Sequence, residues 1–108
     1  MALSRKILNL LQALRTSLGD LYGERLRAVI LYGSYARGTP SAASDVDVMV
    51  VLEGDVNPWT EIQRMGDIVY DIGSRYEELI SIVPVSGADF ASSSEPLVGT
   101  VRREGVQV

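Results

Sequence analysis

Cysteine and histidine are both absent from this chain of 108 residues, and Lys6 is its single lysine. Without cysteine there is no disulfide framework, zinc ribbon or thiol nucleophile. Without histidine there is no Ser-His-Asp triad and no imidazole base. No Gly-Lys-Ser or Gly-Lys-Thr occurs, which excludes a P-loop. Any chemistry must therefore use carboxylates, hydroxyls, arginines, backbone amides or a bound metal.

Long hydrophobic runs are missing as well, and no segment approaches the ~18 consecutive apolar residues of a membrane span. The first residues, MALSRKILNLLQALRTSL, carry polar side chains at helical spacing and no small-residue cleavage site follows them. We therefore expect a soluble, cytoplasmic protein with no membrane partner. The net charge of −4 argues against a broad nucleic-acid surface, although a local basic spot could hold one nucleotide.

The composition is that of an ordinary globular protein, with 46% hydrophobic and 22% charged residues. The length suits one hydrophobic core rather than two. We therefore expect a single domain over residues 1–108.

Hydrophobic periodicity predicts two long helices. Apolar residues recur at steps of three and four from Leu3 to Leu21, and again over 59–76. Asn57 is a suitable N-cap for the second helix, with Pro58 at its first position. Near the end of the chain, Pro96 and Gly105 bracket a third predicted helix.

Continuous apolar runs predict buried strands at 27–33, 45–52 and 79–86. Pro84 indicates that the far half of the last strand lies at an edge or a bulge. Helices alternating with strands in this order predict an α/β or α+β layer structure. The connection over 33–47 is both Gly/Ser-rich and charged, so we expect the functional site there.

Two aspartates open the second strand. Asp45 and Asp47 are two residues apart, so their side chains point to the same face of a strand. Carboxylates held side by side repel each other unless a proton or cation lies between them, and Mg²⁺ prefers such oxygen ligands. An isolated Asp-x-Asp is also compatible with a polar strand start. This pair opens a strand that is apolar on both faces, where an unpaired carboxylate is costly, which favours a metal site.

The first strand ends in Gly33 and Ser34. Glycine permits close backbone approach, and Ser34 can cap a short helix that Gly38 would end. The N–H groups at the start of such a helix can bind a phosphate, and Arg37 could add a charged fork. A plain strand-to-helix turn with a solvent-facing arginine is the alternative. Combined with the aspartates, the turn suits attack on the α-phosphate of a nucleoside triphosphate.

The stretch GSYARGTPSAASDVD consists of Gly-Ser, ten residues and then Asp-x-Asp. This spacing resembles the minimal nucleotidyltransferases of the DNA polymerase beta-like superfamily, as do the internal ARG and SDVD. The order of elements from the first strand to the third agrees with that family over most of the chain. The resemblance implies a small mixed sheet with helices packed mainly on one face and the aspartates on the other.

By the same resemblance, Gly33 and Ser34 would hold the triphosphate, with Arg37 as a further nucleotide-binding residue. Asp45 and Asp47 would be catalytic and bind Mg²⁺, or Mn²⁺ in its place. Many small members resemble the antitoxin half of a pair with a HEPN-domain toxin. The implied activity is transfer of AMP from ATP to a tyrosine of that toxin.

One position departs from the family pattern. The family usually supplies a third carboxylate from the strand after the second long helix, and the corresponding place here holds Ser81. Glu77 and Glu78 precede that strand as substitutes, although both fall at a helix end that we expect to be solvated. Because serine is a weak base and a poor metal ligand, the alternative function is a slow or inactive nucleotide-binding module that neutralises a partner by contact.

An apolar strip on the aspartates' face also bears on partners. Met49 and Val51 share that face, which the family fold leaves without covering helices. Residues 88–108, a second copy or another protein could cover it. A chain of this length is too short for the extra helical domain that larger relatives use to hold their acceptors, so we expect the acceptor to be bound by a partner or to be the partner itself.

Overall fold

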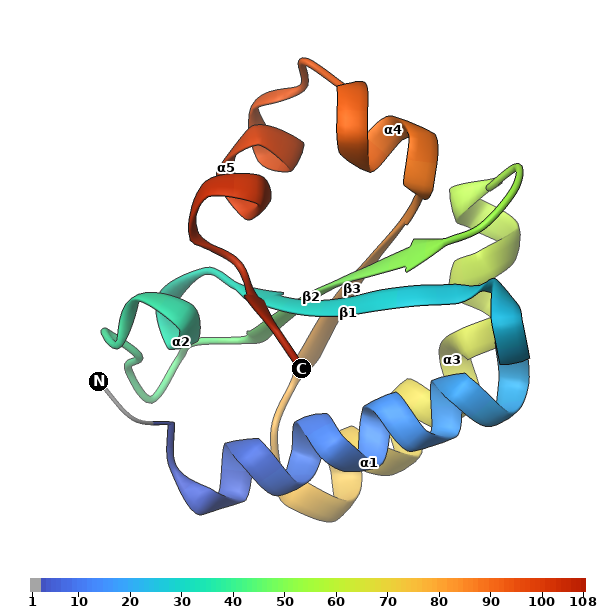
Figure 1. Ribbon diagram of the computed structural model, residues 1–108. Helices are drawn as coiled ribbons and strands as arrows, with labels where there is room; N and C mark the ends of the chain where they lie inside the picture. The colour runs from blue at the N-terminus through green and yellow to red at the C-terminus, as the bar shows by residue number, and fades with distance from the viewer. Residues whose placement is uncertain (1–2) are drawn as a thin grey trace.

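The computed structural model describes residues 3–108 and contains a four-stranded mixed sheet (Figure 1). Its strands are β1 (Leu26–Tyr32), β2 (Val46–Leu52), β3 (Ile80–Ser86) and β4 (Val106–Gln107), in the order β3-β2-β1-β4. Strand β2 is antiparallel to β1 and parallel to β3, and β4 adds antiparallel to the far side of β1. The predicted α/β class with a small mixed sheet is confirmed.

The two long helices, α1 (Arg5–Tyr22) and α3 (Pro58–Tyr76), cover one face of the sheet (Figure 1). Their N-caps are side-chain oxygens: Ser4 accepts the N–H of Ile7, and Asn57 accepts that of Thr60, as the sequence predicts for Asn57. The alternate residues of β2 on this face (Val46, Val48, Val50 and Leu52) join the larger core cluster with the leucines of α1. None of the helices in residues 3–108 combines the length and apolarity that crossing a membrane requires.

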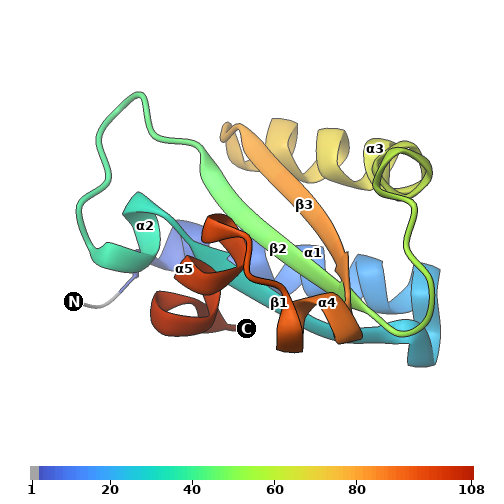
Figure 2. The ribbon, with the colours of Figure 1, turned by 90° about the horizontal axis from the view of Figure 1, so that it is seen from above.

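Two short helices, α4 (Gly87–Ser92) and α5 (Pro96–Glu104), lie on the opposite face, as the view from above shows (Figure 2). Val98 and Val101 of α5 pack with Met49 and Val51 of β2 in a second, smaller core cluster. The C-terminal segment therefore covers the apolar strip on the aspartates' face, which settles the choice left open by the sequence. Neither α4 nor β4 was predicted.

Several boundaries differ from the predictions by one residue. The strand predicted at 45–52 begins at Val46, so Asp45 precedes it, and the strands predicted at 27–33 and 79–86 run over Leu26–Tyr32 and Ile80–Ser86. A 3-10 turn, η1 (Gly23–Arg25), separates α1 from β1.

The predicted short helix is present as α2 (Ser34–Arg37), and Gly38 ends it in the left-handed conformation as expected. The predicted cap at Ser34 was wrong. Gly33 occupies the N-cap position and Ser34 is already helical, so the serine hydroxyl makes no capping hydrogen bond.

Candidate active site

The candidate site lies where β1 ends and β2 begins. The antiparallel pairing of these strands places Tyr32, the last residue of β1, opposite Asp47. The chain leaves β1 at Gly33, passes through α2 and a turn, and returns at Asp45. Strand pairing therefore brings the Gly-Ser turn and the Asp-x-Asp segment to the same end of the sheet.

Gly33 lies directly against the carboxylate of Asp47. Its φ of +77° and ψ of −155° are accessible to glycine and strained for other residues. A methyl group built on its Cα would overlap Oδ2 of Asp47 and lie 3.2 Å from Cγ of the same side chain. Both the backbone conformation and the lack of space thus require glycine here.

The two aspartates are partly exposed and electrostatically coupled. Burial raises the pKa of Asp47, the negative charge of Asp45 raises it further, and the positive charge of Arg37 acts in the opposite direction. Burial and the neighbouring charge therefore disfavour the ionised form of Asp47, and a bound cation would stabilise that form.

The donor set fits Mg²⁺ in part. Within residues 3–108 there is no group of three or more acidic, histidine or cysteine side chains placed to hold a metal ion. Asp45 and Asp47 would supply two carboxylate ligands. The remaining ligands would be water and substrate phosphate oxygens, which is how Mg²⁺ is commonly bound at phosphate sites.

Arg37, at the end of α2, is near Asp47 but already has a partner. Its Nη1 atom lies 3.0 Å from Oε1 of Glu104 near the end of α5, and both side chains are partly exposed. Ser34 lies in the first turn of α2, partly buried beside Gly33. The ion pair with Glu104 could not be foreseen, because the sequence carries no signal that α5 returns to this end of the sheet.

Ser81 occupies the position that the resemblance assigns to a third carboxylate. Parallel pairing places Ser81 of β3 directly opposite Asp47 of β2. Glu77 is exposed, at the C-cap of α3. Glu78 is engaged by two other partners, Tyr35 and Lys6. Neither glutamate takes the place of the missing carboxylate.

Glu78 belongs to a network that sequence reasoning missed. Its Oε1 accepts a 3.0 Å hydrogen bond from the Tyr35 hydroxyl, and its Oε2 lies 2.9 Å from Nζ of Lys6. Burial and then the bond to Glu78 raise the pKa of Tyr35, while the hydrogen bond to Glu78 raises that of Lys6. These contacts join α1 and α2 to the connection between α3 and β3, and so hold the short helix beside the site.

Tyr32 is a second residue that the sequence did not single out. Its side chain is buried opposite Asp47, and burial followed by the charge of Asp47 raises its pKa. The pairing register would have identified it, but register depends on how β1 and β2 align and could not be read from either strand alone.

The nucleotidyltransferase domain model matches residues 11–85. "Putative protein adenylyltransferase MJ1305" of Methanocaldococcus jannaschii is 38% identical over 81 residues, covering 71% of this chain and 54% of that protein. "Putative protein adenylyltransferase MJ0141" of the same organism is 30% identical over 76 residues, covering 70% of this chain and 76% of that protein. The match to the first relative thus spans about half of that relative's length.

A chain in the crystal structure of a toxin-antitoxin with AMP-PNP has a similar fold. Its TM-score is 0.62 at 24% identity, over 94% of this chain and 68% of that one. At this level of identity the likeness concerns the fold alone.

Replacing Gly33 with alanine is expected to lower the free energy of unfolding by about 1–3 kcal/mol, because the backbone conformation is strained for any residue with a Cβ. The overlap with Asp47 adds to this cost. Chemical denaturation measures the change. Gly19→Ala is the matched control, since Gly19 lies within α1 with open space around its Cα and should gain about 0.5–1 kcal/mol. Equal effects at the two glycines would contradict the close approach to Asp47.

Asp47→Asn is expected to raise the melting temperature at pH 7. Burial and the charge of Asp45 raise the pKa of Asp47 above its ordinary value in the folded chain, so the folded chain binds the proton more tightly than the unfolded chain. This group's contribution to stability is therefore complete below the unfolded pKa and is lost as the pH rises through the folded one. The difference between variant and wild type should shrink as the pH is lowered towards 4, as thermal melts across this range would show. If Asp47→Asn were less stable than wild type at pH 7, the unfavourable effect of burial and of Asp45 on the Asp47 carboxylate would be contradicted.

Proposed function

Because this chain belongs to the nucleotidyltransferase domain family, we propose that it transfers AMP from ATP to a hydroxyl group of a protein. The single observation that carries this proposal is the contact of Gly33 with Asp47, beside Asp45. It joins a turn suited to phosphate and a carboxylate pair suited to a divalent cation at one end of the sheet. The names of the two relatives from Methanocaldococcus jannaschii support a protein as the acceptor.

In this mechanism the triphosphate lies along the Gly33–Ser34 turn. Backbone N–H groups and the Ser34 hydroxyl donate to phosphate oxygens. Arg37 adds a positive charge, either by binding the phosphate and Glu104 together or by leaving Glu104 for the phosphate. Asp45 and Asp47 would hold Mg²⁺, or Mn²⁺ in its place. When bound, the ion neutralises phosphate charge and lowers the pKa of an oxygen ligand.

The reaction is a substitution at the α-phosphorus of ATP. The acceptor oxygen forms the new bond, the bond to the bridging oxygen of the β-phosphate breaks, and pyrophosphate leaves. The acceptor proton passes to solvent, because Ser81 can hydrogen-bond the hydroxyl but is a far weaker base than a carboxylate. We therefore expect slow turnover.

We extend the proposal to an antitoxin role, in which the acceptor is a tyrosine of a HEPN-type toxin. The fold shared with a chain from a toxin-antitoxin crystallised with AMP-PNP, an ATP analogue, supports this extension. A second candidate function is a nucleotide-binding module that neutralises its partner by contact without transfer. Ser81 opposite Asp47 is the observation that favours it.

The double variant Asp45→Asn/Asp47→Asn should lose Mg²⁺-dependent ATP binding and AMP transfer while keeping its fold. The reason is that both carboxylate ligands are removed with little change of shape. Purified wild type and variant, with Mg²⁺ and ATP labelled at the α-phosphate, would be mixed with extract of the source cells. A labelled protein that disappears with the variant would support transfer, and ATP binding without any labelled protein would support the second candidate. Unchanged ATP affinity in the variant, by calorimetry, would refute the site assignment.

Ser81→Asp should raise the rate of AMP transfer by about 10²-fold or more, since a positioned base typically contributes 10²–10⁴-fold. Ser81→Asn is the control: asparagine is similar in size to aspartate but cannot act as a carboxylate base, so this variant should keep a rate near that of wild type. Release of pyrophosphate in the presence of acceptor measures both. A rate that Ser81→Asp leaves unchanged would mean that a missing base does not limit turnover.

A further inference from the structure

Strand β3 forms one edge of the sheet, and half of its backbone groups point away from it. The N–H of Val46 donates to the carbonyl of Leu79 at 2.8 Å, and Val46 pairs with Ile80. In a parallel pair of strands, a residue bonds to the two neighbours of its partner rather than to the partner itself. The backbone groups of the odd-numbered residues of β3 therefore bond to β2. The N–H and C=O groups of Ile80 and Ile82 therefore face outward.

Pro84 falls at the next outward-facing position. Proline has no N–H to donate, and it is tolerated in strands chiefly where that donor would point away from the sheet. Pairing along the free edge is thus limited to the first half of β3, around Ile80 and Ile82. This half flanks Ser81, the residue opposite Asp47.

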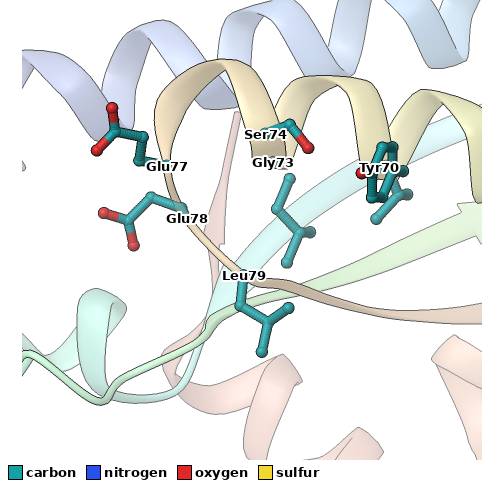
Figure 3. A pocket seen from close by; sticks show the side chains of 8 residues that line it. Tyr70, Gly73, Ser74, Glu77, Glu78 and Leu79 are labelled. Carbon is teal, nitrogen blue, oxygen red and sulfur yellow. The ribbon is translucent and has the colours of Figure 1, made fainter.

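A hollow of about 470 Å³ lies beside this half of the strand, between the end of α3 and the start of β3 (Figure 3). Tyr70, Gly73 and Leu79 are among its lining residues. Tyr70 is 75% exposed and Leu79 is 69% exposed. Because both side chains line the same hollow, they form an apolar patch rather than scattered single residues. We call this hollow, together with the outward backbone of Ile80 and Ile82, the β3 edge groove.

The charged residues along the edge are acidic. Glu77 and Glu78 line the β3 edge groove, and Asp89 and Glu95 line a second hollow farther along β3. Lys6 neutralises Glu78, but the other three acids form no ion pair within residues 3–108. A second copy of this chain would bring the same charges together, whereas a segment with basic residues would complement them.

The geometry next to the site restricts the acceptor side chain. An added strand would lie about 4.8 Å beyond β3, and so about two such spacings from Asp47. Serine and threonine hydroxyls lie close to their own backbone and would not cover that distance. A tyrosine hydroxyl stands at the end of a long side chain, and the small side chain of Ser81 leaves room for it to pass.

We propose that the β3 edge groove binds an extended, basic and apolar segment of the acceptor protein as an additional strand, directing a tyrosine over Ser81 towards Asp47. The inference rests on the proposed function for the transfer step itself. That step forms the bond from the tyrosine oxygen to the α-phosphorus, releases pyrophosphate and gives the proton to solvent. Main-chain hydrogen bonds provide affinity, and the apolar hollow and acidic residues provide selectivity.

Binding is tested without ATP, using a synthetic peptide of alternating lysine and valine around one central tyrosine. Calorimetry should give saturable binding to wild type that weakens at least tenfold in Tyr70→Ser/Leu79→Ser. Leu8→Ser/Leu21→Ser is the matched control, because these leucines are 42% and 39% exposed on α1, and it should bind as wild type does. A peptide N-methylated at alternate residues should also bind at least tenfold more weakly, since its backbone donors are blocked.

Several results would overturn the inference: no binding of the peptide at millimolar concentration, equal loss in the two double variants, or full affinity of the N-methylated peptide. Dimerisation of the free chain that Tyr70→Ser/Leu79→Ser abolishes would also overturn it, by identifying a second copy as the occupant.

The transfer arm separates this inference from the proposed function. With labelled ATP and Mg²⁺, the tyrosine peptide should be labelled, while peptides with phenylalanine or serine in its place should bind equally and remain unlabelled. Peptide binding at the groove without ATP binding would refute the proposed function and leave the docking surface standing. Transfer to a cell protein with an unchanged acceptor KM in Tyr70→Ser/Leu79→Ser would support the proposed function and refute the docking surface.

Discussion

The pairing of Tyr32 with Asp47 is the constraint on which the site depends. It brings the last residue of β1 alongside the second residue of β2, so that Gly33 meets the Asp47 carboxylate. A slip of one residue would move every side chain of β2 to the other face, burying Asp47 among the valines that pack on α1. The burial of Val46, Val48 and Val50 therefore fixes the direction in which the aspartate points.

The same constraint explains how a repelling pair of carboxylates is tolerated. Asp47 is held by a strand whose other side chains are buried on both faces, so the apolar packing of β2 offsets the cost of bringing two negative charges together. The bond from Tyr35 to Glu78 holds α2 at one side, and the Arg37–Glu104 pair connects α2 to α5. The exposed pair with Glu104 contributes little to stability. It is the contact that a bound phosphate could most readily displace.

The sequence predicted what depends on local signals and periodicity. The long helices, the three longer strands, the Asn57 cap and the helix end at Gly38 follow from patterns within a few residues, and the structure contains them all. The partners of Arg37 and Glu78 lie more than 40 residues away or in another element, so no local pattern could reveal them. Helix α4 was missed because its six residues are too short to show a helical period.

Ser81 connects the chemistry of the site with access to it. A carboxylate at this position would supply a base but would place a third negative charge beside Asp45 and Asp47, where burial already disfavours the ionised form of Asp47. Serine avoids that repulsion and leaves the free edge of β3 open towards the aspartates. In exchange, no carboxylate at this position removes the acceptor proton, which must pass to solvent instead. A tyrosine is the hydroxyl side chain best suited to these conditions, because a phenol loses its proton far more readily than an aliphatic alcohol.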